Sequence, residues 1–567
     1  MKMVTRPYKE ADRVRLQQAG VHPLLARLFA ARRIGSASEL AQDFSQLLAP
    51  AALANAERAA CLLADAIAQR KKLLIVADYD ADGATACAVG VRALRAFGAR
   101  VEYLVPNRME LGYGLTPELV DIAARLGPDL LITVDNGIAS VEGVAHAKRL
   151  GIGTLITDHH LPGDALPEAE CIVNPNQPGC SFPSKAIAGV GVMFYVMLAL
   201  RAELRKRGSF KEQQQFNMAS LTDLVALGTV ADVVPLDANN RILVAQGLKR
   251  LRAGGARPGL AALARAAGRA PARATCFDLG FILGPRLNAA GRLADMSLGI
   301  ECLITDDEAR AANCAQELDR LNRERRRIEG EMLDEAAAAL DGLAEPPGAT
   351  VSMYQPGWHQ GVVGLIASRV RERVHRPVFC FALDGKKNEL RGSGRSIPGF
   401  HLRDALDLVS KRDPGLILRF GGHAQAAGLT IRGTDFERFR DLFEKTAAEL
   451  LPEEARLRVI ETDGELEAAY HSLEVAQMLE AQIWGQGFPA PLFCDRFGVE
   501  DQRVVGERHL KLRLVKDGRR LEAMWFNALE TRTRPLLGRI RAAYRLGVNE
   551  FNGLQRPQIT FEAVEPA

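Results

Sequence analysis

The sequence predicts an α/β protein in four parts: a domain built on a parallel sheet, a long connecting helix, a second and smaller α/β domain, and a C-terminal β-barrel. Three observations predict this order. Short apolar runs alternate with helical segments from about residue 71, a charged helical stretch follows residue 305, and short alternating segments separated by turns follow residue 457. The expected boundaries are 1–305, 306–342, 343–452 and 453–567.

Length, charge and cysteine content bound the class of protein. The 567 residues suit three or four domains of about 150 residues each. Lys and Arg (73) nearly balance Asp and Glu (69), and the net charge of +4 excludes a uniformly basic, histone-like protein. No apolar run reaches the roughly 18–20 residues that span a bilayer, and residues 1–18 have no apolar segment typical of an export signal. Nine scattered cysteines with no CxxC pair indicate reduced thiols, so we expect a cytoplasmic protein.

Four apolar runs rich in β-branched residues are the expected strands of the first domain: 71–80, 100–105, 129–135 and 153–160. Helical segments lie between them, as in βαβ units with parallel strands. Three of the runs reach an aspartate where the apolar residues stop, at Asp78, Asp135 and Asp158. Ligands of such sheets bind beyond the carboxyl ends of the strands, so these positions indicate a functional site.

The middle of the chain supplies further helices and a second α/β segment. Helical stretches at 188–204 and 216–236 complete the first domain. A capping box at 305–308 opens a charged run to Asp341, which predicts a spacer helix about 50 Å long. The smaller α/β domain that follows contains two Gly-rich segments, RGSGRSIPGF and FGGHAQAAGLT.

The expected barrel carries a concentrated positive charge. Residues 501–556 hold thirteen Lys/Arg and six Asp/Glu, a net charge of +7 that is typical of a module binding a polyanion. Four aromatic residues of this region either stack on bases or fill the barrel core: Trp525, Phe526, Tyr544 and Phe551. Because they alternate in short strands, we expect at least half of them in the core.

The segment DYDADG places Asp78, Asp80 and Asp82 at alternate positions after a strand. An EF-hand calcium loop is excluded, because its twelfth position requires a glutamate and is Val89 here. Capping of the next helix explains one aspartate, but three together repel one another unless a cation neutralises them.

Other oxygen and nitrogen ligands accompany them: Asp135 in DNG, His159 and His160 in DHH, and Asp232 in TVADVV. Carboxylates and imidazoles without thiolates favour Mn²⁺ or Mg²⁺, and more than four candidates indicate two ions about 3.5–4 Å apart. The alternative is a set of helix caps and hydrogen-bonded core residues.

The Gly-rich segments of the smaller domain predict a phosphate-binding surface. Glycines allow an anion to approach the backbone, Arg395 offers a bidentate fork, and Ser393 and Ser396 add hydroxyl donors. His423 lies in the second Gly-rich segment. The alternative is that these glycines only form tight turns.

Three arginines of the first domain are further candidates. Arg108, which follows the second expected strand, is a candidate for binding a terminal 5′-phosphate. Arg286 and Arg292 in GPRLNAAGR fit either structural or substrate-binding roles.

The motifs DYDADG, VDNGI, TDHH, GTVADVVPL and GPRLNAAGR resemble, in this order, those of the DHH phosphoesterase superfamily. WHQGVVGLIASRV and the two Gly-rich segments resemble its DHHA1 partner domain. With a basic tail that corresponds to an OB-fold barrel, the set resembles the single-strand-specific exonucleases of this superfamily, from about residue 70 to the end. The resemblance implies a 5′→3′ exonuclease on single-stranded DNA that uses Mn²⁺ or Mg²⁺ in DNA repair and recombination.

The resemblance also implies individual roles. The metal ligands of the superfamily fall on Asp78, Asp80, Asp82, Asp135, His159 and Asp232. Asp158 then orients His159, and His160 faces the substrate as a donor to the scissile phosphate or a proton carrier. A metal-activated water serves as the nucleophile. Single-stranded DNA is the expected partner, and a single-strand-binding protein and a repair helicase are logical further ones.

Two other functions stay open at this level. One is a DHH-type hydrolase of oligonucleotides, cyclic dinucleotides or pyrophosphate, although a small substrate needs neither a spacer helix nor a basic barrel. The other is a non-catalytic DNA-binding scaffold, which would be expected to have lost ligand carboxylates. A nucleotide-driven motor is disfavoured, because the sequence contains no GxxxxGK[ST] loop.

Overall fold

The structure is a computed structural model that describes residues 1–107, 112–209, 216–341, 348–384, 388–531, 536 and 538–566. The chain divides into two compact units. The larger comprises Val4–Asp319 and Glu461–Ala567, and the smaller comprises Met1–Met3 and Arg320–Ile460. Within the described ranges, no single helix is long and apolar enough to cross a membrane; one bent pair, 44–52 with 56–68, meets those criteria only when its two parts are counted together.

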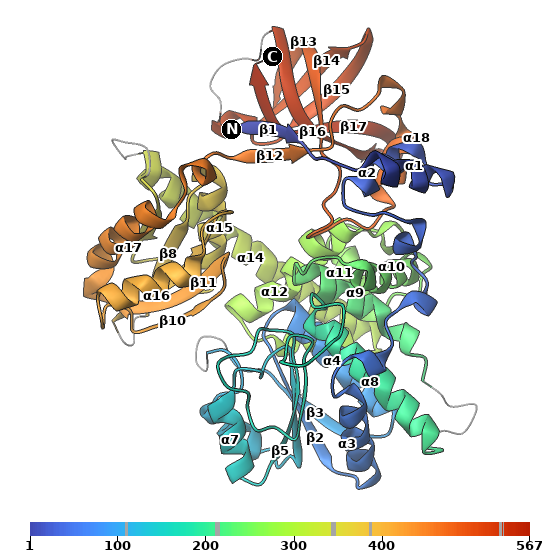
Figure 1. Cartoon of the computed structure of the whole chain (residues 1–567), viewed down its shortest axis with the longest axis vertical. Coiled ribbons are helices and arrows are strands. Elements are labelled where there is room, and N and C mark those ends of the chain that lie inside the picture. The colour runs from blue at the N-terminus through green and yellow to red at the C-terminus, as the bar shows by residue number, and fades with distance from the viewer. Residues whose placement is uncertain are drawn as a thin grey trace. The chain divides into compact units, whose positions relative to one another are not determined.

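A five-stranded sheet in the order β3-β2-β4-β5-β6 forms the base of the larger unit (Figure 1). Every neighbouring pair is parallel. The strands are β2 (Lys72–Ala77), β3 (Arg100–Leu104), β4 (Leu130–Val134), β5 (Gly153–Thr157) and β6 (Cys171–Val173). The central strands are continuous apolar runs, KLLIVA and LLITV, and are buried almost throughout, as a sheet covered on both faces requires.

Helices cover the two faces of this sheet. One face packs against α6 (Pro117–Ala124) and α7 (Val141–Arg149), whose apolar residues join those of β2, β4 and β5 in one core. The other face packs against α4 (Ala81–Ala96) and α8 (Gly189–Lys206), with α3 (Ala56–Ala68) beside α8 (Figure 1).

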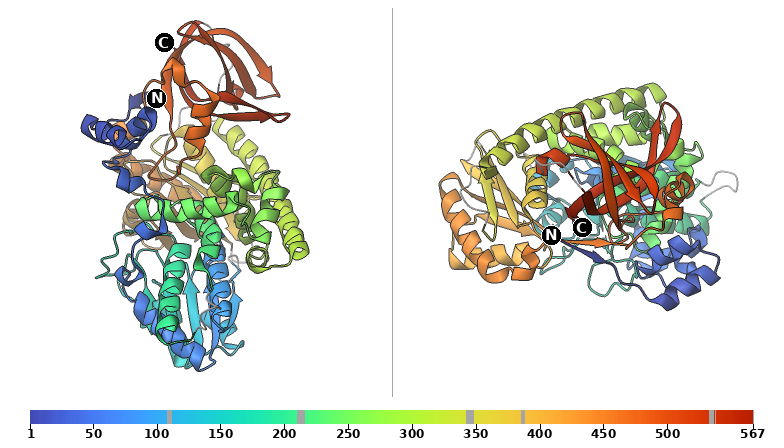
Figure 2. Two further views of the ribbon diagram at one scale, coloured as in Figure 1. Left: turned by 90° about the vertical axis from the view of Figure 1, so that its right-hand side faces the viewer. Right: turned by 90° about the horizontal axis from the view of Figure 1, so that it is seen from above.

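Further helices extend the larger unit beyond the sheet. They are α9 (Thr222–Ala231), α10 (Ala238–Arg252), α11 (Pro258–Ala266), the π-helical η6 (Asp278–Leu283), α12 (Gly284–Leu293) and α13 (Ser297–Ile304). The predicted charged helix is α14 (Glu308–Asp341), 34 residues without a break (Figure 2).

The smaller unit contains a second five-stranded sheet in the order β10-β11-β9-β8-β7. Its strands are β7 (Val351–Tyr354), β8 (Val378–Asp384), β9 (Glu389–Arg395), β10 (Arg419–Gly422) and β11 (Ala426–Arg432). Its helices are α15 (Val363–Val374), α16 (Leu402–Arg412) and α17 (Phe436–Leu450). Four fully buried phenylalanines in edge-on and stacked contacts form the centre of its core: Phe379, Phe381, Phe439 and Phe443.

The C-terminal segment is a closed five-stranded barrel in the order β13-β14-β15-β17-β16 (Figure 2). Its strands are β13 (Phe493–Val505), β14 (His509–Lys516), β15 (Arg519–Trp525), β16 (Gly538–Phe551) and β17 (Leu554–Pro566), with a short α19 (Ala528–Thr531). Asp517 and Gly518 join β14 to β15 with left-handed φ of 49° and 74°, as a two-residue hairpin turn requires.

The four barrel aromatics differ in exposure. Tyr544 is fully buried, whereas Phe526 is 50% exposed. Trp525 is half-buried, with its ring edge-on to Phe561. Phe551 ends β16, and its side chain lies outside what the structure describes. The predicted fold class is thus confirmed, from the parallel sheet to the barrel.

The N-terminal residues, which carry no motif, form β1 (Lys2–Thr5), α1 (Glu10–Gln18) and α2 (Pro23–Ala30). β1 pairs with β12 (Val459–Thr462), and α18 (Leu473–Glu480) follows that strand. Arg32, just after α2, forms a two-pronged ion pair with Asp463 at 2.9 and 3.0 Å, and both side chains are 1% exposed. Arg32 also donates to the carbonyls of Leu28 and Pro489, each at 2.7 Å. This pair ties the first residues of the chain to the segment that leads into the barrel.

Breaking this ion pair should destabilise the protein. Asp463→Ala leaves the Arg32 guanidinium buried without its carboxylate, which costs about 3 kcal/mol or more. We expect a lower denaturant midpoint and faster proteolytic release of residues 1–55. Removing the exposed partner in Glu10→Ala, which breaks the surface pair with Arg13, should leave both measurements unchanged. An unaltered midpoint in Asp463→Ala would show that the N-terminal segment is held by other contacts.

Candidate metal centre

Carboxylates converge at the carboxyl edge of the parallel sheet. Asp78, Asp135 and Asp158 directly follow β2, β4 and β5, which are consecutive neighbours in the sheet. Their backbone N–H groups continue the strand ladder, with Asp78 donating to Val134 O, Asp135 to Thr157 O and Asp158 to Val173 O at 3.0–3.2 Å. The ladder therefore fixes where the three side chains begin.

The other two aspartates of DYDADG are held by helix N-termini. Asp80 caps α4, accepting the N–H of Gly83 at 3.0 Å. Asp82 is fully buried, and its carboxylate accepts the N–H groups of Gly189 and Val190, the first two residues of α8, at 2.6 and 2.9 Å. A carboxylate is favoured at a helix N-terminus, so α8 fixes Asp82 at the edge of the sheet.

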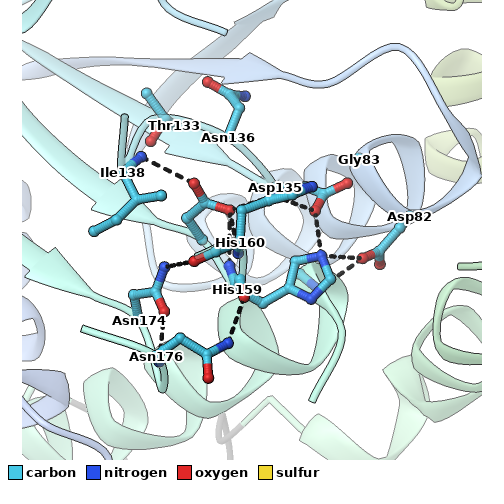
Figure 3. A network of polar contacts seen from close by, with 12 residues as sticks. Asp82, Gly83, Thr133, Asp135, Asn136, Ile138, His159, His160, Asn174 and Asn176 are labelled. Atoms are coloured by element: carbon cyan, nitrogen blue, oxygen red, sulfur yellow. Dashed lines mark hydrogen bonds and ion pairs between the residues drawn. The ribbon is translucent and has the colours of Figure 1, made fainter. Parts of the chain in front are cut away.

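His159 lies at the centre of this cluster (Figure 3). Its Nε2 is 3.1 Å from Asp135 Oδ1, 3.5 Å from Asp232 Oδ2 and 3.9 Å from Asp82 Oδ2. Three groups of residues each place their ligand atoms within 4.8 Å of one another: Asp135 with His159 and His160, Asp82 with His159 and Asp232, and Asp78 with Asp80 and Asp135. The structure thus brings together all six residues that we predicted as metal ligands.

The charges in this cluster are unfavourable without a cation. Burial and the neighbouring Asp80 raise the pKa of Asp82 to about 7. Burial and the Asp82 charge likewise raise the pKa of Asp135 and of Asp232 well above the usual range. Among the described residues, neither Asp135 Oδ1 nor His159 Nε2 has a hydrogen bond of acceptable geometry, although both atoms are buried. The donor set therefore fits divalent cations that prefer oxygen and imidazole ligands.

The two histidines of DHH have opposite protonation tendencies. Burial and the adjacent His160 lower the pKa of His159 to about 4, which leaves a neutral imidazole able to bind a metal. Burial alone would also lower the pKa of His160, but hydrogen bonding to Asp158 and the charge of that carboxylate outweigh it and raise the pKa to about 9. Without a cation at the site, the Asp158 carboxylate therefore favours the protonated form of His160.

Asp158 differs from our expectation. We predicted that it orients His159, but its Oδ1 lies 2.8 Å from the ring Nδ1 of His160. The same oxygen accepts the backbone N–H groups of His159 and His160, at 2.7 and 3.1 Å. Its Oδ2 accepts the N–H of Ile138. The carboxylate is saturated by these contacts, so the ring that it positions is that of His160.

Several residues of the site were not predicted from the sequence. Tyr113 places its hydroxyl 3.2 Å from the His160 ring nitrogens. Asn174 donates to the carbonyl of His160 and Asn176 to that of His159, at 2.9 and 2.6 Å, which anchors the DHH backbone. The signal for Asn174 and Asn176 was their place after a fifth apolar run, CIV, which was too short to identify as a strand.

Two positions near the site require glycine, because another segment lies too close to leave room for a Cβ atom. A Cβ at Gly189 would lie 2.6 Å from Asp135 Oδ1, and one at Gly291 would lie 1.9 Å from the Tyr79 carbonyl oxygen. Beside Gly291 on the same helix, Asn288 Oδ1 accepts the N–H of Ala81 at 2.7 Å. The GPRLNAAGR segment therefore holds the DYDADG loop directly.

Backbone strain occurs at the site as well. Asp135 has a left-handed φ of 63°, and Val233, next to Asp232, has φ of 62°. Such a conformation is unfavourable for a β-branched residue and persists only where the surroundings enforce it.

The predicted phosphate-binding residues of the smaller unit separate into two groups. Ser393 and Arg395 lie at the end of β9, where Arg395 donates to Ser393 Oγ at 3.2 Å. A Cβ at Gly364, in the first turn of α15, would lie 2.9 Å from Ser393 Oγ, so this helix N-terminus adjoins them. Arg395 is paired with Ala426 in β11, just after the turn that contains His423.

Ser396 does not join this group. It is fully buried, and its hydroxyl donates to the Phe400 carbonyl at 2.7 Å, so our prediction that it contacts phosphate is wrong in this structure. The glycines also have a packing role: Cβ atoms at Gly392 and Gly394 would lie 2.4 Å from the rings of Phe381 and Phe379. Their presence alone is therefore no evidence for an anion site.

The three candidate arginines of the larger unit have different outcomes. Arg286 is 7% exposed, with Nε and Nη2 on Asp319 Oδ1 at 3.0 and 2.9 Å, an arrangement that favours the structural role over substrate binding. Arg292 is half-buried near the end of α12. Arg108 lies outside the described residues.

Three family models match the chain. The N-terminal domain of the DHH family matches residues 72–229, the DHHA1 domain matches 347–449, and the RecJ OB domain matches 462–563. The single-stranded-DNA-specific exonuclease RecJ of Salmonella typhimurium strain LT2 is 49% identical over 570 aligned positions, and the alignment covers 98% of this chain and 98% of the relative.

Solved structures agree with this relationship. The crystal structure of RecJ in complex with Mn²⁺ from Thermus thermophilus has a TM-score of 0.82 and 30% identity, and the match covers 100% of this chain and 79% of that chain. RecJ in complex with Mg²⁺ from the same organism has a TM-score of 0.76 and 29% identity, covering 100% and 78%. Since sequence, domain order and fold all agree, the chain belongs to the RecJ family of DHH phosphoesterases.

Proposed function

We propose that this chain is a 5′→3′ exonuclease that hydrolyses single-stranded DNA in DNA repair and recombination. The observation that carries the proposal is the meeting of Asp78, Asp80, Asp82, Asp135, His159 and Asp232 at one edge of the sheet. Its relatives are named as single-stranded-DNA-specific exonucleases, which supports the substrate.

These six residues hold two divalent ions, Mn²⁺ or Mg²⁺. The ions neutralise the scissile phosphate and lower the pKa of the attacking water when they are bound. The related Thermus structures contain Mn²⁺ or Mg²⁺, which supports the choice of ion.

His160 acts on the substrate as a hydrogen-bond and proton donor. Its Nδ1 is held by Asp158, and the raised pKa keeps the ring protonated at neutral pH. A protonated imidazole stabilises negative charge on the phosphate or on the leaving oxygen. Tyr113, whose hydroxyl meets the same ring, limits the orientations open to it.

Ser393 and Arg395, with the N-terminus of α15 and the His423 turn, bind a phosphate of the strand. Arg395 offers two parallel donors, and the positive end of the α15 dipole favours an anion. The 5′→3′ polarity rests on the family relationship.

The parts of the chain divide this work. Residues 1–305 carry the metal centre, and residues 306–342 form the helix that connects it to the next domain. Residues 343–452 bind phosphate, and residues 453–567 form the basic barrel that binds the strand. A single-strand-binding protein and a repair helicase are the further partners that we propose, because they would supply single strands to such an enzyme. The nine cysteines, none of which is in a disulfide, support a cytoplasmic location.

A DHH-type hydrolase of short oligonucleotides or cyclic dinucleotides is the second candidate, since the metal centre alone would serve either. The basic barrel favours the long strand. Digestion of 5′- and 3′-labelled single strands and duplexes, with and without Mn²⁺, tests the proposal. Release of the 5′ label first, only from single strands and only with metal, is expected; hydrolysis of dinucleotides alone would favour the second candidate.

One prediction concerns Asp135, a proposed ligand of the metal centre. Asp135→Asn should lower activity more than about 100-fold, because the amide is a poor substitute for an anionic ligand. Asparagine tolerates the left-handed φ of this position, so the fold should persist. Asp129→Asn, at the opposite end of the same strand, is the matched control and should retain activity. Near-normal activity of Asp135→Asn at saturating Mn²⁺ would exclude it as a ligand.

Stability measured in a chelator gives an independent readout of the same site. The folded state raises the pKa of Asp82 and Asp135, so it binds protons more tightly than the unfolded chain does. The stability that these two carboxyl groups contribute to the metal-free protein should therefore be fully present below about pH 4 and be lost as the pH rises toward 7. Asp135→Asn should show a smaller fall and a smaller rise in Tm on adding Mn²⁺. Equal pH dependence of the two proteins would contradict the repulsion argument.

The phosphate-binding residues make a further prediction. Arg395→Ala should raise KM for a 5′-phosphorylated strand about tenfold or more, and Arg395→Lys should raise it less, because lysine keeps the charge but loses the fork. Arg391→Ala, on the same strand and paired with Asp384, is the control. If all three variants kept the KM of the unaltered protein, the surface would not bind phosphate.

The barrel prediction concerns salt. The triple substitution Arg503→Ala, Arg513→Ala and Arg539→Ala removes three exposed charges from β13, β14 and β16. The logarithmic salt slope for binding a long single strand should become shallower by about 2, at about 0.7 per lost phosphate contact. Neutralising Arg70, Arg125 and Arg149, at the amino edge of the parallel sheet, should leave the slope unchanged. An equal effect of both triples would mean that net charge, and not the barrel, sets the slope.

A further inference from the structure

Two aromatic rings are largely exposed on a segment that packs against α9, the helix that Asp232 follows. Phe281 is 66% exposed and Phe277 is 56% exposed. Their rings stack on each other, with centroids 5.0 Å apart and planes 23° apart. Leu279 and Leu283, on the same turn, are buried and anchor it, so the two rings are not required for its packing.

The helix that carries these rings is well fixed. Thr275 donates its N–H and its hydroxyl to Asp278 Oδ2 at 2.9 and 2.8 Å, which fixes the start of the helical turn that leads into η6. η6 is a π-helical turn, a conformation that occurs frequently at functional sites. The rings are therefore displayed by a defined element.

The same helix leads to the metal centre. A Cβ at Gly280 would lie 3.2 Å from Val230 Cγ1, and one at Gly284 would lie 3.0 Å from Ala231 Cβ. These contacts are with the last turn of α9, which Asp232 follows directly. η6 also continues into α12, where Asn288 holds the N–H of Ala81 in the DYDADG loop. The aromatic pair thus shares its support with two segments of the metal centre.

On its other side, the segment adjoins the barrel. Arg273 forms an ion pair with Glu550 of β16. Arg269, 51% exposed by side chain, lies 3.5 Å from Asp278. The segment that carries the rings therefore contacts both the helix that leads to Asp232 and a strand of the basic barrel.

On this basis, and assuming the proposed function, we propose that Phe277 and Phe281 form a stacking platform for an unpaired base of the substrate strand. Every nucleobase has an apolar face that stacks on an aromatic ring without sequence preference. In a duplex, each base is paired with the opposite strand and stacked between its neighbours, so it is not available to stack on the two rings. The platform therefore selects single strands. The adjacent arginines suit the phosphates that flank the bound base.

Fluorescence of 2-aminopurine, moved stepwise along a 5′-phosphorylated strand with phosphorothioate linkages that resist hydrolysis, locates the stacked base. We expect strong quenching at one or two neighbouring positions, lost in Phe281→Ala and retained in Phe281→Trp. Phe281→Ala should weaken binding about tenfold, which is about 1.4 kcal/mol. Phe44→Ala, which removes an exposed ring far away in the sequence, is the matched control and should bind normally.

A strand with an abasic site at the quenched position separates stacking from a structural effect. The unaltered protein should bind this strand about tenfold more weakly, and Phe281→Ala should add no further loss. If Phe281→Ala weakened binding of the intact strand and of the abasic strand by the same factor, the proposal would be overturned, because the loss would then indicate a disturbed fold. Unchanged binding and quenching in the Phe277→Ala/Phe281→Ala double variant would also overturn it. That result would indicate that the two rings contact a protein partner instead. If the unaltered protein neither bound nor cleaved single strands, the proposed function itself would fail.

Discussion

The repulsion among buried carboxylates at one edge of the parallel sheet is the constraint on which this structure depends. Asp82 and Asp135 are almost completely buried, and their carboxyl groups adjoin those of Asp78, Asp80 and Asp232. Like charges in such surroundings cost several kcal/mol each unless cations or hydrogen bonds compensate them. The fold keeps them together because backbone contacts at strand ends and helix N-termini fix their positions, and divalent cations bound there would make the arrangement favourable.

Those contacts come from backbone groups and not from flexible side chains. The N-terminus of α8 donates two N–H groups to Asp82, and the strand ladder fixes Asp78, Asp135 and Asp158. Glycines permit this density: Gly189 lets α8 approach Asp135, and Gly291 lets α12 approach the DYDADG loop. A site built in this way needs little reorganisation when the ions bind, which is the condition for effective electrostatic catalysis.

Sequence reasoning predicted the part of the site that follows from strand topology. Parallel strands end at a common edge, so aspartates after consecutive strands must converge, and they do. It did not predict contacts that depend on the course of later loops: the Tyr113 hydroxyl on His160, the preference of Asp158 for His160, or the inward hydroxyl of Ser396.

Sequence reasoning also did not predict the role of the N-terminal residues. Arg32 meets Asp463, a partner 431 positions away, and no local pattern encodes such a pair. Sequence patterns of period 2 and 3.6 determine which elements form, whereas the partners of individual polar side chains depend on tertiary packing.

The same electrostatic constraint explains why the chain needs parts outside the metal centre. A cluster of carboxylates repels a polyanion, so affinity for the strand must come from elsewhere. The small net charge of +4 conceals this separation, since residues 501–556 alone carry +7. Charge attraction of that kind weakens with salt and does not distinguish single strands from duplexes. Stacking on Phe277 and Phe281 involves no ion release and requires an unpaired base, so it supplies the selectivity that a basic surface lacks.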